Sequence, residues 1–535
     1  MSSVESVIDT SCVAEWLGVH TAASKKCLVE QLSQWKSDHH QLQHLCGKYT
    51  AMKQVLQKQP ELFSECEQVF QEFAHMETEV ETLLSDPSAL EKESYNEILF
   101  LKPVFQPLNF VPFFLMLWSV LRIYLFPGLA LLIPFLTLLS PYFLLTFVLD
   151  VPITFHRYRV LLQSMLSGNT QALLDPLALT ATASSTSSFV QTAKQCGMAL
   201  FTIIQGILQP YWTHQHLSSI DQMIQTKGGL LMRCRERYER LATLLERAGC
   251  VPFRCPLPPF SSEREAVAHA ILSPFYFKMM LKVVGSLEVL VRLAHHPDLH
   301  PVRWVSSTTP VFRAKDTFDF RVPVDQRKTI SVRMDTKRHA LLTGPNKGGK
   351  STVLRALACS ALFAHTYGCA MGHVTMTPFR AMYVCLTPDD LPGSKSRFER
   401  EIEFTAQTLR GDQPLLVLID ELFHSTNPPD ALRSCEIYCH KLWNKPQIVS
   451  IISTHLFDFV ERAAPTVQRL CCPATIDKGT VRFSYELVEG ICKVSSVDSL
   501  LQQNGMEVGA LCAPTPLWRH SAPIPPSIGD DYVFT

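Results

Sequence analysis

The chain has 535 residues, of which 47% are hydrophobic and only 18% are charged. Lys plus Arg and Asp plus Glu both number 49, which excludes a protein that binds nucleic acid through a strongly basic overall charge, although a local basic patch stays open. The length suffices for two or three domains.

Residues 1–102 are polar, and their apolar positions recur at helical spacing, as Leu28, Leu32 and Trp35 do. Few glycines or prolines interrupt this pattern, so it predicts a helical N-terminal region. The first twelve residues lack a basic stretch followed by an apolar core, and we expect no secretory signal.

The composition changes abruptly in residues 103–150, because the only charged residue between Phe110 and Leu149 is Arg122. Pro127-Gly128 divides this run into two apolar segments of nearly the length that a membrane helix needs, about 20 residues. We therefore predict a transmembrane hairpin with a tight turn at Pro127-Gly128. The flanking basic residues are typical of ends that both stay in the cytosol.

Two alternatives to this hairpin stay open: a buried core hairpin, or one that lies in the membrane interface. Arg122 is the main objection to a spanning segment, since a charge in the middle of a bilayer costs about 2.5 kcal/mol or more.

Helical patterns return in 151–305, and strand-like patterns dominate from 306 to 510. The first of these regions is interpreted as a helical lever or core-like domain, and the second as an α/β ATPase domain. Residues 511–535 are rich in proline and are expected to form a loose tail. Cys435, Cys439 and His440 lie on a predicted helix without a second ligand pair, so we interpret them as ordinary side chains and not as a metal site.

The strongest motif follows the apolar segment HALLT and precedes a predicted helix, which is the context that a P-loop requires. Glycines in such a loop let backbone N–H groups surround phosphates at a helix N-terminus. Lys350 is expected to neutralise the β- and γ-phosphates of ATP, and Ser351 to hold Mg²⁺. The candidate nucleotide-binding residues of this motif are Gly344, Pro345, Asn346, Lys347, Gly348, Gly349, Lys350, Ser351 and Thr352.

Two further apolar segments end in polar residues. LLVLIDE places Asp420 and Glu421 after a predicted strand, where Asp420 is the candidate Mg²⁺ ligand and Glu421 the residue that orients or deprotonates the attacking water. IVSIIST is followed by His455. In a parallel sheet the strand ends meet at the ligand crevice, so His455 is a second candidate catalytic residue.

Together these motifs resemble the MutS family of ABC-type P-loop ATPases. GPNKGGKST is similar to the family's phosphate-binding loop, and SKSRFEREIEFTAQTL (394–409) resembles its signature element, here Ser396, Phe398 and Glu401. RFSYELVEG (482–490) resembles its last strand pair. The sequence DELFHSTN (420–427) is closer to that of membrane-associated MutS-like proteins than to that of the mismatch-repair members.

The resemblance implies a homodimer in which Ser396 and Phe398 of a second copy cap the γ-phosphate of ATP. Closure of the dimer would move the helices of 190–300. The chain also departs from the family. Lys347 stands where a Met is usual, and His424-Ser425 replaces Arg-Gly. Residues 325–328, expected beside the adenine, offer no aromatic ring, although Arg327 could stack instead.

We therefore expect a Mg²⁺-dependent ATPase and nucleotide-dependent dimer switch that is attached to an intracellular membrane, with the ATPase domain facing the cytosol. The alternative is a soluble nuclear or cytoplasmic ATPase that binds DNA in mismatch repair or recombination. A scaffold that binds nucleotide without hydrolysing it is a third, weaker interpretation.

Overall fold

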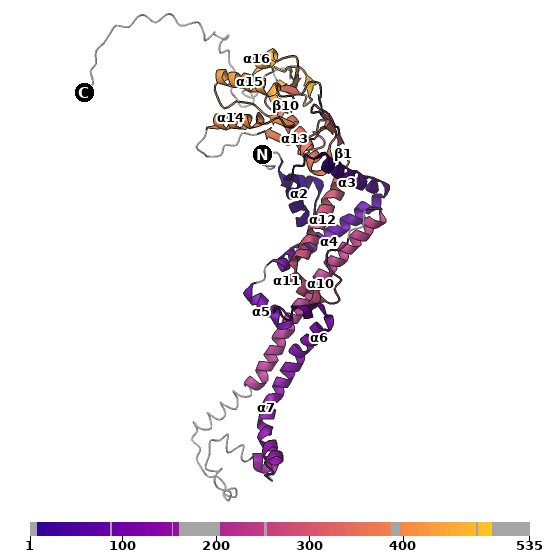
Figure 1. Cartoon of the computed structure of the whole chain (residues 1–535), viewed down its shortest axis with the longest axis vertical. Coiled ribbons are helices and arrows are strands. Elements are labelled where there is room, and N and C mark those ends of the chain that lie inside the picture. The colour runs from indigo at the N-terminus through magenta and orange to yellow at the C-terminus, as the bar shows by residue number, and fades with distance from the viewer. Residues whose placement is uncertain are drawn as a thin grey trace, which may run out of the picture. The chain divides into compact units, whose positions relative to one another are not determined.

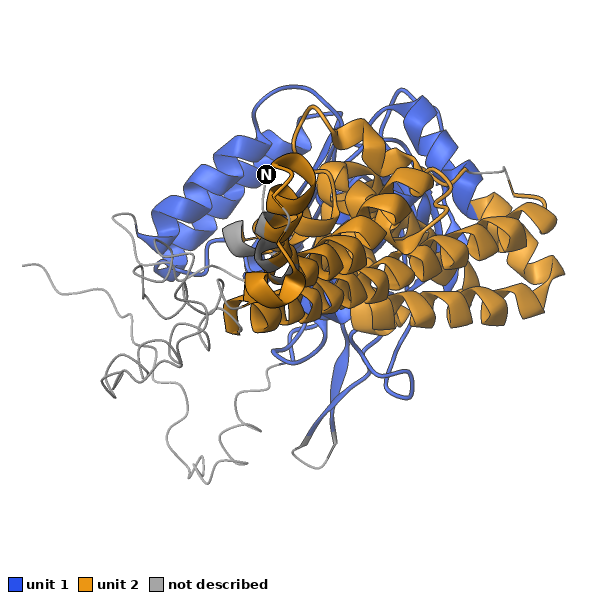
Figure 2. Cartoon of the chain, turned by 90° about the horizontal axis from the view of Figure 1, so that it is seen from below, with its two compact units in different colours: residues 1–13, 32–49, 297–535 blue, residues 14–31, 50–296 orange. Residues whose placement is uncertain are grey.

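The computed structural model describes residues 8–85, 88–151, 153–159, 204–250, 254–386, 396–477 and 480–494. The chain divides into two compact units (Figure 2). Unit 1 comprises residues 1–13, 32–49 and 297–535, and unit 2 comprises 14–31 and 50–296. The expected tail at 511–535 lies outside the described residues.

Unit 1 is built around a six-stranded sheet with strand order β14-β11-β5-β10-β9-β8. Neighbouring strands from β11 to β8 are parallel, and β14 is antiparallel to β11. The strands are β5 (His339–Thr343), β8 (Ala381–Cys385), β9 (Leu415–Ile419), β10 (Ile448–Ser453), β11 (Val467–Cys471) and β14 (Val488–Glu489).

The three central strands β5, β9 and β10 are buried along their whole length. They read as continuous apolar runs because helices cover both faces of a parallel sheet. The helices of this part of the chain are α13 (Lys350–Tyr367), α14 (Arg397–Thr408), α15 (Pro428–Trp443) and α16 (Phe457–Arg462) (Figure 1).

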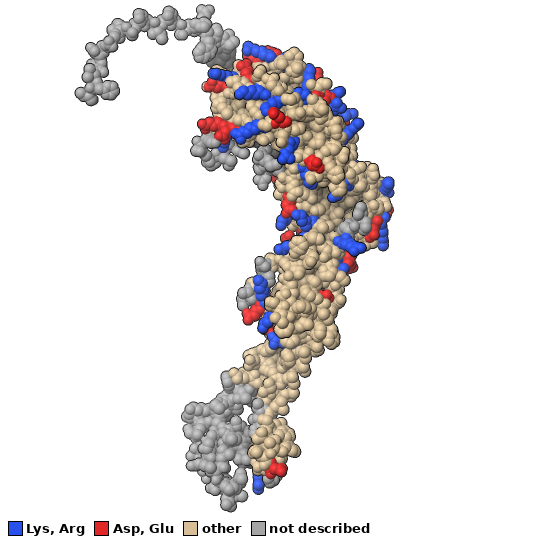
Figure 3. Space-filling model, viewed as in Figure 1, with Lys and Arg blue, Asp and Glu red and all other residues tan. Residues whose placement is uncertain are grey.

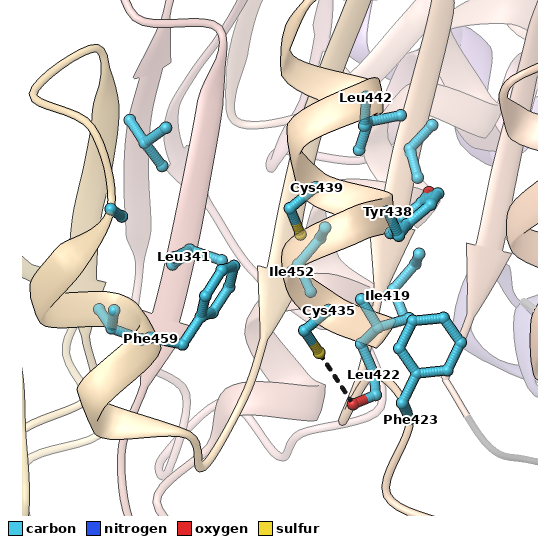
Figure 4. Close-up of a cluster of buried hydrophobic side chains, with 14 of the residues drawn as sticks. Leu341, Ile419, Leu422, Phe423, Cys435, Tyr438, Cys439, Leu442, Ile452 and Phe459 are labelled. Carbon is cyan, nitrogen blue, oxygen red and sulfur yellow. Dashed lines mark hydrogen bonds between the residues drawn. The ribbon is translucent and has the colours of Figure 1, made fainter. Parts of the chain in front are cut away.

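One face of the sheet packs against α15. Cys435 and Cys439 of this helix are buried beside Ile452 and Ile419 (Figure 4). The Cys435 thiol donates a hydrogen bond to the Leu422 carbonyl at 3.7 Å. These two cysteines therefore serve as core side chains at the base of the loop that follows β9.

A second sheet in unit 1 has the order β2-β7-β3-β4, and two strand pairs, β1-β6 and β12-β13, complete the described strands. Their bounds are β1 (Leu299–Pro301), β2 (Arg303–Trp304), β3 (Phe312–Thr317), β4 (Ile330–Met334), β6 (Cys369–Met371), β7 (His373–Met376), β12 (Ala474–Asp477) and β13 (Thr480–Phe483).

The N-terminal segment 32–49 belongs to unit 1 through specific contacts. The Trp35 ring stacks on His365 with centroids 3.8 Å apart, and its indole N–H donates to the Phe379 carbonyl at 3.0 Å. The Tyr49 hydroxyl donates to the Leu299 carbonyl at 2.7 Å. This part of the predicted helical N-terminal region therefore contributes to the core of the C-terminal domain.

Unit 2 is helical, and helices α1 (Thr10–Leu17) and α3 (His39–Lys58) run from one unit into the other. Helices make up most of the described part of 8–102, in agreement with the sequence-based expectation. The remaining helices are α2 (Ala22–Leu32), α4 (Pro60–Leu84), α5 (Ala89–Ile98), η2 (Gln106–Phe110), α6 (Pro112–Val120), α7 (Phe126–Phe143), α10 (Gln209–Arg247), α11 (Glu263–Leu272) and α12 (Pro274–His295).

Two buried carboxylates fix the start of α2. Glu77 accepts hydrogen bonds from the backbone N–H groups of Ala22 and Ala23, at 2.5 and 2.6 Å. Glu288 accepts from the Thr21 hydroxyl at 2.7 Å. Negative charge is favourable at a helix N-terminus, and the bonds satisfy donors that a helix leaves unpaired.

The predicted turn at Pro127-Gly128 is wrong. Both residues lie inside α7, and the chain stays helical from α6 through the π turns η3 (Leu121–Leu125) and η4 (Leu144–Val148). Proline lacks an N–H donor and its ring clashes with the carbonyl four residues earlier. The π turn η3 ends two residues before Pro127, and the Ile123 carbonyl, which the proline leaves without its N–H partner, lies 2.7 Å from Nδ1 of His214.

One helix in the described part of the chain, Pro112–Pro134, is long and apolar enough by length and composition to cross a membrane. A core helix of a soluble protein passes the same test but is mostly buried, whereas only 17% of this segment's window is buried.

Candidate functional site

The parallel sheet of unit 1 brings three loops together at the carboxyl ends of its central strands. β10 pairs with both neighbours, so that Ile452 lies opposite Ile419 of β9 and Leu341 of β5. The loops that follow β5, β9 and β10 therefore begin at one edge of the sheet, where ligands bind in open α/β folds.

The loop after β5 is the glycine-rich segment 344–349, and its conformation requires glycine. Gly349 has φ of +97° and directly precedes α13. A Cβ on Gly344 would lie 2.9 Å from the Cys472 carbonyl oxygen. These glycines let the backbone turn tightly at the N-terminus of α13, where unpaired N–H groups favour anions.

Lys350, the first residue of α13, is buried below this loop. Its ammonium donates hydrogen bonds to the carbonyls of Gly344 and Pro345, at 3.0 and 3.2 Å. Burial lowers the pKa of Lys350 from its ordinary value, and the nearby Glu421 and Asp420 act in the opposite direction. A buried cation at the centre of the loop is suited to binding a phosphate.

The other residues of the motif surround this centre. Lys347 is exposed and has φ of +66°. Asn346 is exposed beside it, and Thr352 lines an adjacent cavity.

Asp420, which directly follows β9, joins the glycine-rich loop to β10. One of its carboxylate oxygens accepts a hydrogen bond from the Ser351 hydroxyl, and the other accepts from the Ser453 hydroxyl. A carboxylate beside a hydroxyl is a set of hard oxygen donors that suits Mg²⁺. The two candidate metal ligands, Ser351 and Asp420, are therefore in contact and fit the ion.

Ser453 was not singled out from the sequence. Its hydroxyl also accepts the backbone N–H of Glu421 at 2.8 Å. Strand pairing was the signal that could have identified it, because Ser453 follows Ile452, the partner of Ile419, and so lies level with Asp420. We infer that Ser453 positions both acidic residues.

Glu421, His455 and Lys350 meet on the open side of the site. The Nε2 atom of His455 lies 3.1 Å from Oε1 of Glu421 and 3.3 Å from Nζ of Lys350. The hydrogen bond from His455 is the largest cause that holds the pKa of Glu421 below its ordinary value of 4.5. Glu421 is thus kept as a carboxylate, the form that accepts a proton or orients water.

Glu421 also has φ of +51°, a conformation that few residues other than glycine adopt. Such backbone costs about 1–3 kcal/mol and persists where the surroundings enforce it, which is common at active sites.

Replacing His455 with Ala is expected to move the acidic limb of any pH–activity profile to higher pH. The reason is that Glu421 loses the partner that lowers its pKa, so the carboxylate is protonated at a higher pH. The measurement is the pH dependence of kcat for both proteins between about pH 4 and 8. An acidic limb at the same pH in both would show that His455 does not tune Glu421.

A cavity of about 450 Å³ lies next to the glycine-rich loop. Tyr485 and Arg327 line it together with Gly349 and Thr352. One face of the Arg327 guanidinium is covered by the Phe318 ring, with Cζ 4.1 Å from the ring centroid. Tyr485, whose ring lies near Gly349, supplies the aromatic side chain that residues 325–328 lack. It was missed in the sequence because it lies on the distant segment between β13 and β14.

The signature residues lie at the start of α14, which contacts the loop after β9. Ser396 is exposed and caps this helix, because its hydroxyl accepts the backbone N–H of Glu399 at 3.2 Å. The Phe398 ring contacts Phe423 of its own domain with centroids 5.9 Å apart. A role of Ser396 and Phe398 toward a second copy stays a prediction. The preceding segment 387–395 lies outside the described residues.

Glu401 of the same helix is largely buried, and burial raises the pKa of its carboxyl. It lies 3.5 Å from the His424 ring, and His424 in turn is 2.9 Å from the Glu421 carbonyl. His424, which stands where the family has an arginine, therefore connects α14 with the loop that carries Asp420 and Glu421.

Comparison with known proteins also relates this domain to MutS proteins, as the sequence motifs do. Residues 340–508 match the family model MutS domain V. "DNA mismatch repair protein MutS" from one strain of Thermus thermophilus is 31% identical over 176 residues, which is 32% of this chain and 22% of that protein. The proteins of the same name from a second strain of Thermus thermophilus and from Thermus caldophilus are also 31% identical over 176 residues and are covered to 21%.

The chain thus spans only about a fifth of the length of the relatives it matches. The similarity falls on the unit that holds the glycine-rich loop, the acidic pair and His455. A helical N-terminal region followed by a mixed α/β domain fits this assignment. The C-terminal domain is therefore of the MutS domain V kind, and the chain is MutS-like over about a third of its length.

Proposed function

We propose that this chain binds ATP together with Mg²⁺ and hydrolyses it. The observation that carries the proposal is the meeting of three loops in one site, in which Ser351 contacts Asp420 while His455 contacts both Glu421 and Lys350. Similarity to MutS proteins supports ATP as the ligand.

Each residue has a role that follows from its position. The N–H groups at the start of α13 and the Lys350 ammonium bind the phosphates. Ser351 and Asp420 hold Mg²⁺, which when bound supplies positive charge to the β- and γ-phosphates. Glu421 orients water and accepts its proton, and His455 hydrogen-bonds Glu421 and faces the same space.

The active form is proposed to be a homodimer. Ser396 is exposed at the N-terminus of α14, a helix end that favours anions. In a dimer, this end and the neighbouring Phe398 would face the γ-phosphate on the other copy. ATP would then stabilise the dimer by its higher affinity for the closed state.

The test is ATP hydrolysis by the purified full-length chain, measured over a range of protein concentrations. We expect hydrolysis that requires Mg²⁺, stops when EDTA removes the metal, and rises more steeply than in proportion to protein concentration. The proposal would be refuted if the protein, at concentrations that give dimers, failed both to bind and to hydrolyse ATP.

Tyr485 is proposed to stack on the base of the nucleotide. Tyr485→Ala is expected to raise KM for ATP about tenfold, because stacking of a base on an aromatic ring contributes about 1–3 kcal/mol. Tyr485→Phe keeps the ring and should keep KM. Equal KM values for the Ala and Phe variants would exclude the stacking role.

Two downstream roles are proposed for such an ATPase. The names of the relatives favour a role on DNA in mismatch repair, and the soluble nuclear or cytoplasmic alternative goes with that role. The exposed apolar helix Pro112–Pro134 instead favours an ATPase switch attached to an intracellular membrane, with the ATPase domain in the cytosol. DNA binding that weakens steeply with salt would support the first role, and co-flotation with lipid vesicles would support the second.

A further inference from the structure

The helical segment 112–148 of unit 2 exposes apolar side chains along its whole length. Phe113, Leu136 and Phe147 are 66%, 61% and 74% exposed. Soluble monomers rarely expose contiguous apolar surface beyond a few hundred Å². Figure 3 shows no Lys, Arg, Asp or Glu on the visible face of α7 between its two ends. A helix that is apolar on all sides needs an apolar environment on all sides.

The charge-free part of this segment has the dimensions of a bilayer. No Asp, Glu, Lys or Arg occurs between Arg122 and Asp150, a stretch of about 40 Å at 1.5 Å per residue. A bilayer with its headgroups is about 40–45 Å thick. Arg122 at one end is paired with Glu97. At the other end Asp150 is followed by Arg157 and Arg159.

Tyrosine side chains mark two levels within this length. Tyr124 and Tyr142 are about 27 Å apart along the helix, close to the roughly 30 Å thickness of the hydrocarbon core. Each is part of an aromatic cluster, since Tyr124 lies 5.4 Å from His214 and Tyr142 lies 5.2 Å from Tyr158. Tyrosine and tryptophan concentrate at the two interfaces of a membrane.

A second helix runs antiparallel beside the first. The π turn η7 (Ile204–Leu208) leads into α10, and His214 of α10 approaches the Ile123 carbonyl at 2.7 Å while Gly206 packs on Pro134 further along. A Cβ on Gly206 would lie 2.5 Å from the Pro134 ring. Small residues allow such close contacts between helices in membranes.

The described start of this second helix exposes both polar and apolar side chains. Gln205, Gln209 and Thr213 line a cavity of about 640 Å³ together with Arg122 and residues of α7. Ile207 and Trp212 are 42% and 61% exposed. Ile207 and Trp212 therefore add to the exposed apolar surface of the helix pair.

We propose that the helix from η3 through α7 to η4, residues 121–148, crosses a lipid bilayer, with η7 and the start of α10 packed beside its first half. Residues 150–159 then lie on one side, and the remaining helices of unit 2 lie on the other. Lipid is the occupant that fits because it would cover all the apolar surface of α7 that η7 and α10 leave exposed, whereas a protein partner would cover one stripe. This inference deepens the membrane-attached role proposed above and does not depend on ATP hydrolysis.

The experiment places two cleavage sites for one specific protease in the full-length chain. One site is inserted after Thr154, at the far end of α7, and the other after Gly249, an exposed turn beyond α10. The protein is reconstituted into sealed phosphatidylcholine vesicles and the protease is added outside. We expect each molecule to be cut at one site and never at both, whatever its orientation, until detergent opens the vesicles.

Cleavage at both sites in sealed vesicles would overturn the proposal, because it would place both cleavage sites on the same side of the bilayer. A hairpin with its turn at Pro127-Gly128, or a helix lying in the membrane interface, would give that result. Failure to float with the vesicles would overturn it as well, including the case of a soluble dimer that covers the apolar helices. ATP hydrolysis is measured in the same samples, so that failure of the ATPase proposal is recognised separately.

A pair of variants supplies the second arm. Leu136→Lys puts a charge at mid-length on an exposed position and should weaken partition into vesicles about 100-fold, the cost of a charge in the bilayer centre. Val324→Lys, on an exposed position of unit 1, should leave partition unchanged. Equal partition of both variants would refute the crossing.

Discussion

Glu421→Gln is expected to lower kcat for ATP hydrolysis by about 10²–10⁴-fold while ATP still binds. A positioned general base contributes about that factor, and the amide can neither accept the proton nor carry the charge that orients water. The phosphate-binding groups are unchanged, because Lys350 and Ser351 belong to α13 and not to the loop after β9. The measurements are single-turnover hydrolysis and equilibrium binding of ATP.

Two controls sharpen this experiment. Glu436→Gln changes an exposed carboxyl of the same domain, on α15, and should not reproduce the loss of hydrolysis. ATP-bound dimers should accumulate for Glu421→Gln in analytical ultracentrifugation, because the closed state forms but cannot react. A kcat near that of the wild type would remove Glu421 from its proposed role.

Much of the site could be predicted because its residues follow the ends of apolar segments. Continuous runs such as LLVLI and IVSIIS indicate strands buried on both faces, and parallel strands place their following loops at one edge. Ser351, Asp420, Glu421 and His455 were therefore named from the sequence. In the structure their side chains form two connected sets of contacts.

Residues that reach the site from outside those loops could not be predicted in this way. Tyr485 lines the neighbouring cavity from the segment between two late strands, and its distance along the chain from Gly349 hides the contact. Ser453 ends its strand as a small polar residue, which periodicity cannot distinguish from an ordinary core serine. Its role depends on the register between β9 and β10.

The apolar region shows where local propensity misled the prediction. Pro127-Gly128 is a turn signal in a soluble chain, yet both residues lie inside α7. A π turn lies just before Pro127, and the helix continues although proline lacks a backbone N–H donor. The second helix beside α7 comes from residues 204–217, far along the chain. A window of adjacent residues contains no information about that pairing.

Lys350→Met is expected to weaken ATP binding by about 100-fold or more, because the charge-assisted hydrogen bonds from its ammonium to phosphate contribute about 1.5–3 kcal/mol each. The same variant is not expected to destabilise the chain without nucleotide. Burial lowers the pKa of Lys350 below 10.5, so between that lowered pKa and 10.5 the unfolded chain binds more protons and stability rises with pH. Below this window the buried charge is a cost to the folded state.

Methionine has a similar length and removes that cost, although it also removes the hydrogen bonds to the Gly344 and Pro345 carbonyls. The thermal midpoint without nucleotide should therefore equal or exceed that of the wild type, while stabilisation by added ATP disappears. Calorimetry with and without Mg²⁺-ATP measures both quantities. A lower midpoint would mean that the lysine holds the loop together, and unchanged stabilisation by ATP would mean that it does not bind the phosphates. A gain in stability coupled to a loss of binding is what distinguishes a residue kept for its ligand from one kept for the fold.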